Sequence, residues 1–181
     1  SYAKWGFDYL KYDWCSYGNV INGLPDNDPS KVSSLSYNGG SVLNTAVKPF
    51  KMMGDYLREQ PRDIVFSVCQ YGMSDVWKWG GSVGGNLWRT TNDITDTWVS
   101  VKNIALDQDK SAPYAKPGNW NDPDMLVVGT VGWGNPHKSK LKPDEQYLHI
   151  SLWSLFAAPL LIGCDMEKLD DFTLNLLTND E

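Results

Sequence analysis

Short apolar runs alternate with helical patterns five times along this chain of 181 residues. The runs have the length of strands, and no hairpin turn joins one run to the next. Consecutive strands that are connected through a helix run parallel to each other. The sequence therefore predicts an α/β fold built from repeated βα units around a parallel sheet.

The expected elements follow from the periodicity of the apolar residues. Strands are predicted over residues 7–15, 63–69, 87–93, 119–128 and 160–165. Helices are predicted over residues 42–59, 74–83, 95–106, 143–158 and 170–178. Ser74 is the expected N-cap of the second helix. The helix over 143–158 is apolar on most faces, which predicts that it is buried, and residues 16–41 and 129–140 are expected to be loops.

Polar residues follow the predicted strands at their C-terminal ends: Asp13, Gln70, Asp93, Asp124 and Asp165. In a (β/α)8 barrel the active site lies at this edge of the sheet. Five units are too few to close such a barrel, so about three strands would lie outside this chain. An open doubly wound sheet is the alternative, and the absence of a Gly-rich phosphate loop argues against it. We expect residues 1–181 to form part of one barrel domain.

The composition excludes several kinds of partner. A formal net charge of −6, with 16 scattered Lys and Arg, argues against nucleic acid. No apolar run is long enough to span a bilayer, so a membrane is not an expected partner. Nine Trp and nine Tyr suit a carbohydrate, whose C–H faces pack on aromatic rings. A neutral, hydroxyl-rich substrate therefore fits this chain best.

Metal chemistry is not expected, because the chain has three Cys, two His and no zinc-site spacing. The odd Cys count leaves at least one without a partner in the chain. His149 falls within the predicted buried helix and is expected to be a core residue, and His137 a loop residue. The chain lacks an initiator Met and a signal peptide, so we expect an excerpt of a longer protein.

The stretch from Phe7 to Cys15 places a carboxylate at the end of a strand. Lys11 and Asp13 project from the same face because side chains alternate along a strand. The Lys11 cation favours the ionised form of Asp13, as a carboxylate nucleophile requires. An ordinary ion pair at the strand end explains the same residues.

A second carboxylate gives Asp13 a catalytic partner. If the first and third strands lie two apart, the backbones of Asp13 and Asp93 stand about 10 Å apart, at roughly 4.8 Å per strand. Their carboxyl groups then meet at about 5 to 5.5 Å, as in a retaining glycosidase. Asp96 near Asp93 favours an acid role for Asp93. Arg89 opposes that role, unless it holds Asp13 or substrate hydroxyls.

Four motifs carry a family resemblance. They are Lys-Tyr-Asp-Trp-Cys at 11–15, Trp-Arg-Thr-Thr-Asn-Asp-Ile-Thr-Asp-Thr-Trp at 88–98, Trp-Asn-Asp-Pro-Asp-Met-Leu at 120–126 and Ala-Pro-Leu-Leu-Ile-Gly-Cys-Asp at 158–165. Together they resemble the α-galactosidases (melibiases) of glycoside hydrolase family 27, in clan D. The likeness runs across essentially the whole chain, in order.

This resemblance implies a retaining double displacement on terminal α-D-galactosyl groups, without a cofactor. Asp13 is implied as the nucleophile and Asp93 as the acid/base. The implied substrate contacts are Lys11, Gln70, Met73, Arg89, Asp124 and Met125. Gln70 and Met73 favour galactose, because relatives that accept N-acetylgalactosamine have small residues there. An α-galactoside oligosaccharide or polysaccharide is the implied substrate, in a secreted, periplasmic or lysosome-like compartment.

The resemblance also bears on the thiols and on completeness. It places a disulfide partner for Cys15 upstream of this chain, and leaves Cys69 and Cys164 as free thiols. Because the implied upstream strands carry further sugar ligands, the 181 residues alone are expected to be inactive. The alternatives are a relative acting on β-L-arabinopyranosides, α-N-acetylgalactosaminides or α-glucans, and a non-catalytic sugar-binding barrel.

Several residues also have structural interpretations. Asp124 lies in Asn-Asp-Pro-Asp, where such residues often cap turns instead of binding a ligand. Asp122 is expected to cap or turn the chain, and Asp165 to be structural. Trp77 and Trp79 are expected in the core, not at the substrate site.

Overall fold

A computed structural model describes residues 2–15, 41–132 and 134–180 of the chain. The chain divides into two compact units. Unit 1 comprises Ser1–Asn92 and Ser111–Asp122, and unit 2 comprises Asp93–Lys110 and Pro123–Glu181. The loop predicted over residues 16–41 lies almost wholly outside the described residues.

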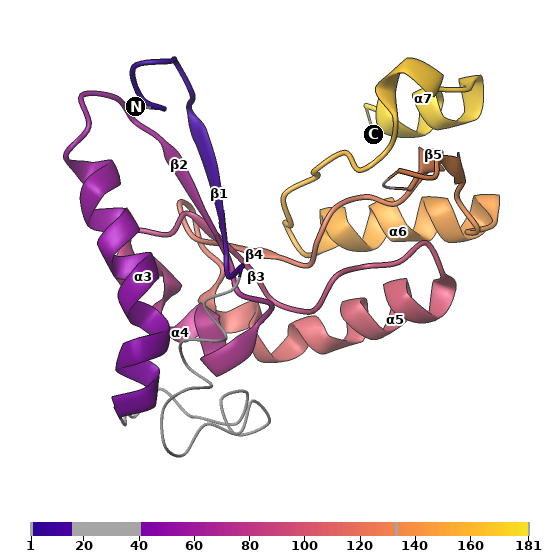
Figure 1. The fold of residues 1–181 in the computed structure, drawn as a ribbon. Helices are drawn as coiled ribbons and strands as arrows, with labels where there is room; N and C mark the ends of the chain where they lie inside the picture. Colours follow the sequence, from indigo (N-terminus) through magenta and orange to yellow (C-terminus); the bar gives the residue numbers. More distant parts are fainter. Residues whose placement is uncertain (1, 16–40, 133, 181) are drawn as a thin grey trace. The chain divides into compact units, whose positions relative to one another are not determined.

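Among the described residues, the sheet of unit 1 has four parallel strands. They are β1 (Tyr9–Asp13), β2 (Val65–Cys69), β3 (Leu87–Arg89) and β4 (Trp120–Asp122). The strands lie side by side in chain order, β1-β2-β3-β4, and Figure 1 shows β1 next to β2. A barrel adds its strands in this order, whereas a doubly wound sheet reverses direction at its switch point. The observed order therefore favours the barrel over the doubly wound alternative.

Helix α3 (Ser41–Arg58) and the short helix α4 (Val76–Trp79) belong to unit 1, where 3-10 turns at Met73–Asp75 and Gly80–Val83 flank α4. The apolar core between these elements and the sheet contains Phe50, Phe66, Val68, Val76, Trp77, Trp79, Val83 and Trp88. The predicted core positions of Trp77 and Trp79 are therefore confirmed. The predicted N-cap at Ser74 is wrong, because Asp75 takes the cap position and Ser74 lies within the preceding turn.

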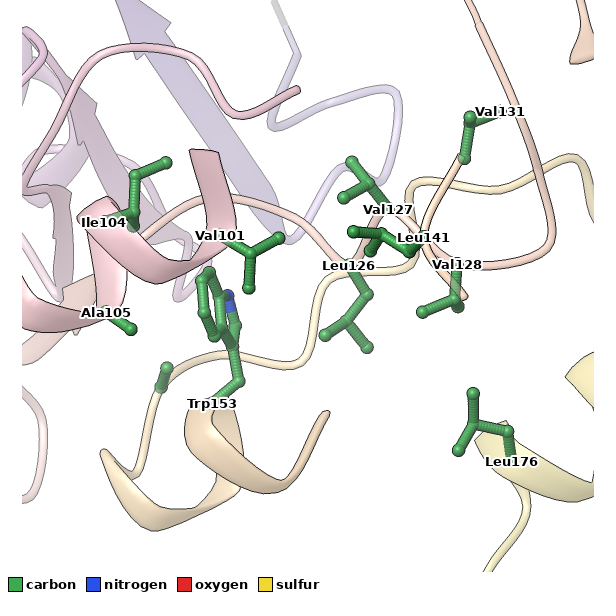
Figure 2. Packing of buried hydrophobic residues seen from close by; sticks show 11 residues of the cluster. Val101, Ile104, Ala105, Leu126, Val127, Val128, Val131, Leu141, Trp153 and Leu176 are labelled. Atoms are coloured by element: carbon green, nitrogen blue, oxygen red, sulfur yellow. The ribbon is translucent and has the colours of Figure 1, made fainter. Parts of the chain in front are cut away.

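The described residues of unit 2 form the helices α5 (Trp98–Leu106), α6 (Pro143–Leu155) and α7 (Asp171–Leu177). Figure 2 shows the indole of Trp153 projecting from α6 toward Val101 of α5. Trp153 is fully buried, and its Nε1 donates a hydrogen bond to the Asp124 carbonyl oxygen at 2.6 Å. The core of this unit thus also fixes the backbone of a predicted site residue. No helix in the described ranges combines the length and apolarity needed to cross a membrane.

Two predicted elements of unit 2 differ from the structure, at residues 160–165 and 129–140. The expected strand at 160–165 is reduced to one parallel bridge between Leu126 and Ile162. The expected loop at 129–140 contains an antiparallel pair, β5 (Thr130–Val131) and β6 (His137–Lys138). Asp165 has the structural role predicted for it, because its carboxylate caps the 3-10 turn Met166–Lys168.

Helix α6 is buried on one side only, so the predicted burial on most faces is wrong. His149 and Trp153, four residues apart, face the core, whereas Leu155 is 79% exposed and Tyr147 and Leu148 are also exposed. Residues four apart lie above one another on a helix, so one stripe is enough to anchor α6. Apolar residues occur on most faces of this helix, so its sequence did not indicate which face packs against the core.

His149 is a core residue, as predicted, and is fully buried. The Val127 N–H donates to His149 Nε2 at 3.1 Å, which requires an unprotonated nitrogen there. The Trp153 ring stands edge-on with its centroid 4.2 Å from that of the imidazole. Burial lowers the pKa of His149 from 6.5 to about 4. Protonation of this ring is therefore coupled to opening of the unit 2 core.

Acid is expected to destabilise the protein through His149. Between about pH 6.5 and 4 the unfolded state binds a proton at this ring that the folded state excludes, so stability falls as the pH falls. A shift of this size corresponds to about 3 kcal/mol. Thermal unfolding near pH 7 and near pH 4.5 should show a larger loss for the wild type than for His149→Gln, whose amide oxygen can still accept from Val127.

His137 offers a control of opposite sign. The Asn135 carbonyl and the Asp96 carboxylate raise the pKa of His137. Its stabilisation is fully present below the ordinary pKa of 6.5 and is lost as the pH rises through the higher folded value. His137→Gln should therefore leave the acid-induced loss in place. An equal acid-induced loss in the wild type and in His149→Gln would contradict the role of His149.

Candidate active site

Four polar side chains lie in one row across the sheet of unit 1. Asp13 on β1 is in register with Cys69 on β2, and Arg89 on β3 with Asp122 on β4. Val68 on β2 is in register with Trp88 on β3. The next residues along these strands, Cys69 and Arg89, therefore lie opposite each other. Residues in register on parallel strands project from the same face. The strand ends thus gather two carboxylates, a thiol and a guanidinium on one face.

Asp13 is a half-buried carboxylate at the end of β1. Its Oδ1 accepts a hydrogen bond from the Tyr71 hydroxyl at 2.9 Å and a long one from the Cys15 N–H at 3.4 Å. The Trp14 N–H donates to the Cys69 carbonyl oxygen at 2.9 Å, which continues the pairing of β1 with β2 past Asp13. Lys11 is exposed and lies on the same face of β1, as predicted. These hydrogen bonds orient the Asp13 carboxylate, the candidate nucleophile, at the end of β1.

Cys69 contributes no charge to this row. Burial raises the pKa of its thiol to about 11; the cations of Lys11 and Arg89 lower it, and the carboxylates of Asp13 and Asp122 add to the rise. A thiol with this pKa is protonated at neutral pH and is a poor nucleophile. All three Cys are free of disulfides within the chain. The thiol is therefore not the candidate reactive group of this row, which leaves its carboxylates.

The loop after β2 is tightly turned. Gln70 is buried, and its Nε2 donates to the Met73 carbonyl oxygen. Tyr71 has a left-handed φ of 63°, and Gly72 follows with φ 80°. A Cβ on Gly72 would lie 2.0 Å from the Thr90 carbonyl oxygen, so only glycine fits there. This contact fixes the loop against the residue that follows β3.

Arg89 is 1% exposed, so its guanidinium contacts other groups of the protein and not solvent. Its Nη2 donates to the Thr91 carbonyl oxygen at 3.2 Å, and its Nη1 lies 3.9 Å from Cys69 Sγ. The guanidinium carbon stands 5.6 Å from the centre of the Tyr71 ring, within cation–π range. Arg89 thus supports the tyrosine that contacts Asp13.

In unit 2, Asp93 is exposed, and the next residue, Ile94, is hydrogen-bonded to the Asp124 carboxylate. The Ile94 N–H donates to Asp124 Oδ2 at 2.9 Å, and the Met125 N–H donates to Asp124 Oδ1 at 2.8 Å. Asp124 is buried and has a left-handed φ of 88°, which is rare for a residue with a side chain. Its carboxylate therefore ties the residue after Asp93 to the segment that follows Pro123.

Asp96, three residues after Asp93, anchors the same stretch of chain at a second point. Its Oδ2 accepts from His137 Nε2 and from the Lys140 N–H, each at 3.0 Å. Burial raises the pKa of Asp96, but the Lys140 amide and His137 outweigh burial and bring the pKa below its ordinary value. Thr97 caps α5 by accepting from the Ser100 N–H. Asp93 therefore leads into a segment that is anchored at several points.

The predicted site residues divide between the two units. Unit 1 contains Lys11, Asp13, Gln70, Met73 and Arg89, and unit 2 contains Asp93, Asp124 and Met125. The predicted approach of the Asp13 and Asp93 carboxyls stays a prediction. The sequence predicted a strand over residues 87–93, but β3 ends at Arg89. Asp93 therefore lies beyond the end of the strand.

Sequence reasoning missed three residues of unit 1: Cys69, Tyr71 and Asp122. The period-two face of β2 would have indicated Cys69, whereas no local pattern indicates the direction of the Tyr71 side chain after the strand end. Asp122 was expected to cap or turn, yet it is buried in β4 beside Arg89. Within the described ranges, no group of three or more His, Cys, Asp or Glu residues has an arrangement suited to a metal ion.

Comparison with known proteins identifies similar chains. Alpha-galactosidase 2 of Arabidopsis thaliana is 39% identical over 184 residues, covering 100% of this chain and 37% of that protein. Alpha-galactosidase I from Mortierella vinacea has a similar structure, with a TM-score of 0.75 at 25% identity over 98% of this chain and 43% of its own. A GH27 β-L-arabinopyranosidase from Geobacillus stearothermophilus gives 0.76 at 27% identity, covering 98% and 37%.

These relatives are longer than the chain, which spans less than half the length of each. The structural likeness confirms the predicted α/β barrel class. A sequence model of one family, Alpha galactosidase A, matches residues 1–181. The chain therefore belongs to the Alpha galactosidase A family of melibiases.

Proposed function

We propose that the protein carrying this chain is a retaining α-galactosidase, and that residues 1–181 form part of its (β/α)8 catalytic domain. The observation that carries the proposal is the Asp13 carboxylate at the end of β1, with Lys11 on the same face and the Tyr71 hydroxyl on Oδ1. A carboxylate fixed in this way suits attack on an anomeric carbon. The relatives named as alpha-galactosidases support the same activity.

In the proposed first step, Asp13 attacks the anomeric carbon while Asp93 donates a proton to the departing glycosidic oxygen. The bond to the aglycone breaks and a galactosyl ester of Asp13 forms. In the second step Asp93 removes a proton from water, whose oxygen attacks the same carbon and displaces Asp13. Two inversions leave the configuration of the sugar unchanged. No cofactor takes part in either step.

The burial of the predicted contact residues separates two roles. Three of these residues are nearly inaccessible to solvent and make hydrogen bonds within the protein: Gln70, Arg89 and Asp124. This favours a role in supporting the site over direct contact with the sugar. Lys11, Met73 and Met125 are more accessible and suit contact with sugar. The Gln70 and Met73 pair keeps bulky side chains in the loop after β2, which suits galactose better than N-acetylgalactosamine.

A β-L-arabinopyranosidase is the second candidate, because one similar structure has that activity. Arabinopyranose has the ring stereochemistry of galactose without the exocyclic hydroxymethyl group, so the same carboxylate pair would serve both sugars. A non-catalytic sugar-binding barrel has no need of a nucleophile. The expected substrate is an α-galactoside oligosaccharide or polysaccharide, met in a secreted, periplasmic or lysosome-like compartment.

The full-length protein is expected to hydrolyse nitrophenyl α-galactoside and to release α-galactose as the first anomer, followed by NMR spectroscopy. Its kcat/KM should exceed that for nitrophenyl β-L-arabinopyranoside and nitrophenyl α-N-acetylgalactosaminide by about tenfold or more, the effect of one well-placed or one clashing group. Release of β-galactose first would exclude the retaining mechanism. A preference for the arabinopyranoside would favour the second candidate, and sugar binding without turnover would favour the binding barrel.

A further inference from the structure

We propose that Tyr71 is a positioning residue for the nucleophile, and that its hydroxyl promotes the second chemical step by stabilising the departing Asp13 carboxylate. The inference rests on the proposed function and adds a residue that the resemblance did not assign. The observation behind it is the 2.9 Å hydrogen bond from the Tyr71 hydroxyl to Asp13 Oδ1.

This hydrogen bond distinguishes the two oxygens of Asp13. Among the described residues both donors to the carboxylate, the Tyr71 hydroxyl and the Cys15 N–H, lie on Oδ1. An oxygen that already accepts hydrogen bonds is the weaker nucleophile. Attack on the sugar therefore falls to Oδ2, and Oδ1 becomes the carbonyl oxygen of the ester.

Tyr71 is held from several sides, as a positioning role requires. The Gln70 side chain donates to the Met73 carbonyl oxygen and closes the loop around Tyr71. Gly72, directly after Tyr71, packs against the Thr90 carbonyl oxygen too closely for any Cβ. The Arg89 guanidinium faces the Tyr71 ring. Tyr71 keeps a left-handed φ of 63°, a conformation unfavourable for an aromatic residue, and such strain is concentrated at functional sites.

The charge on Oδ1 changes in opposite directions in the two steps. In the first step the Asp13 electron pair forms the bond to the anomeric carbon, so Oδ1 loses negative charge and its hydrogen bond weakens. In the second step the ester bond breaks, the pair returns to the carboxylate, and the hydrogen bond strengthens. A hydrogen bond to a charged acceptor is stronger than one to a neutral acceptor. The hydroxyl therefore favours the second step over the first.

The test is Tyr71→Phe in the full-length protein, which keeps the ring that faces Arg89 and removes only the hydroxyl. With an activated aryl α-galactoside the galactosyl enzyme should accumulate, because its breakdown is slowed by about tenfold, a typical effect of one lost charge-assisted hydrogen bond. Steady-state kcat and KM should fall together while kcat/KM stays within about threefold. Rapid mixing should show a burst of phenolate larger than that of the wild type.

Tyr147→Phe removes an exposed hydroxyl on α6 and serves as the matched control. Its kinetics should equal those of the wild type. Unchanged kcat and KM in Tyr71→Phe would overturn the proposal, and so would a fall in kcat/KM at constant KM, which is the result expected of a merely structural residue. Absence of activity in the wild type would instead refute the proposed function, so the two failures are distinguishable.

Discussion

Asp13→Ala is expected to lower the turnover of α-galactosides by about 10⁴-fold or more in the full-length protein, because it removes the atom that forms the covalent intermediate. The side chain stands at the end of β1, and its neighbour in the row, the Cys69 thiol, offers no substitute nucleophile because it is buried and its pKa is raised to about 11. The measurement is the rate of nitrophenolate release.

Azide should restore part of the activity of Asp13→Ala. The small anion enters the space left by the carboxylate and attacks the anomeric carbon from the same side, so a single inversion gives β-galactosyl azide. The product would show that the variant is folded and that the acid/base is intact. An α-configured azide, or no azide product together with full loss of activity, would contradict the assignment of Asp13 as nucleophile.

Asp8→Asn provides a matched control in the same segment. Asp8 precedes β1, is exposed and pairs with Arg62. It alternates with Asp13 along the segment and so belongs to the opposite side. Exposed ion pairs contribute little to stability. Asp8→Asn should therefore retain wild-type turnover and give no glycosyl azide.

The part of the site that was predictable from sequence is the part built on strands. The period-two alternation of the segment from Phe7 to Asp13 placed Lys11 and Asp13 on one face, and the structure has them there. The parallel direction of the strands also follows from the alternation of strand and helix. These features depend on local pattern, which a single sequence displays.

The tight turn after β2 was not predictable, because a contact distant in sequence determines it. Tyr71 turns toward Asp13 only with its left-handed backbone, and that backbone is fixed where Gly72 meets the Thr90 carbonyl oxygen. The hydrogen bond itself joins residues 58 positions apart. A pattern of Gly and polar residues predicts a loop but not the direction of one hydroxyl.

Asp124 shows a similar limit. Its sequence, Asn-Asp-Pro-Asp, is typical of a turn, and its carboxylate does bind the next backbone N–H, that of Met125. The other oxygen accepts from Ile94, 30 positions earlier, beside the proposed acid/base. The local pattern thus predicted the capping contact, while the contact beside the proposed acid/base depends on the fold of unit 2.

Asp93→Ala is expected to slow substrates according to their leaving group. A galactoside with an alkyl or sugar aglycone should lose about 10²- to 10⁴-fold in kcat/KM, the usual contribution of general acid catalysis. An activated nitrophenyl galactoside, whose leaving group needs no proton, should keep kcat/KM within about tenfold. Its kcat should still fall, because Asp93 also activates water in the second step. Rates for a series of aryl and alkyl galactosides provide the measurement.

Azide then separates the roles of the two carboxylates. In Asp93→Ala the galactosyl ester of Asp13 still forms, with inverted configuration, and azide attacks that ester without needing a base. A second inversion gives α-galactosyl azide, the opposite anomer to the one expected from Asp13→Ala. Asp109→Asn, at an exposed acidic residue of unit 2, should behave as the wild type. Equal losses for activated and unactivated substrates would show that Asp93 is not the proton donor, because removal of an acid cannot slow a step that needs no proton.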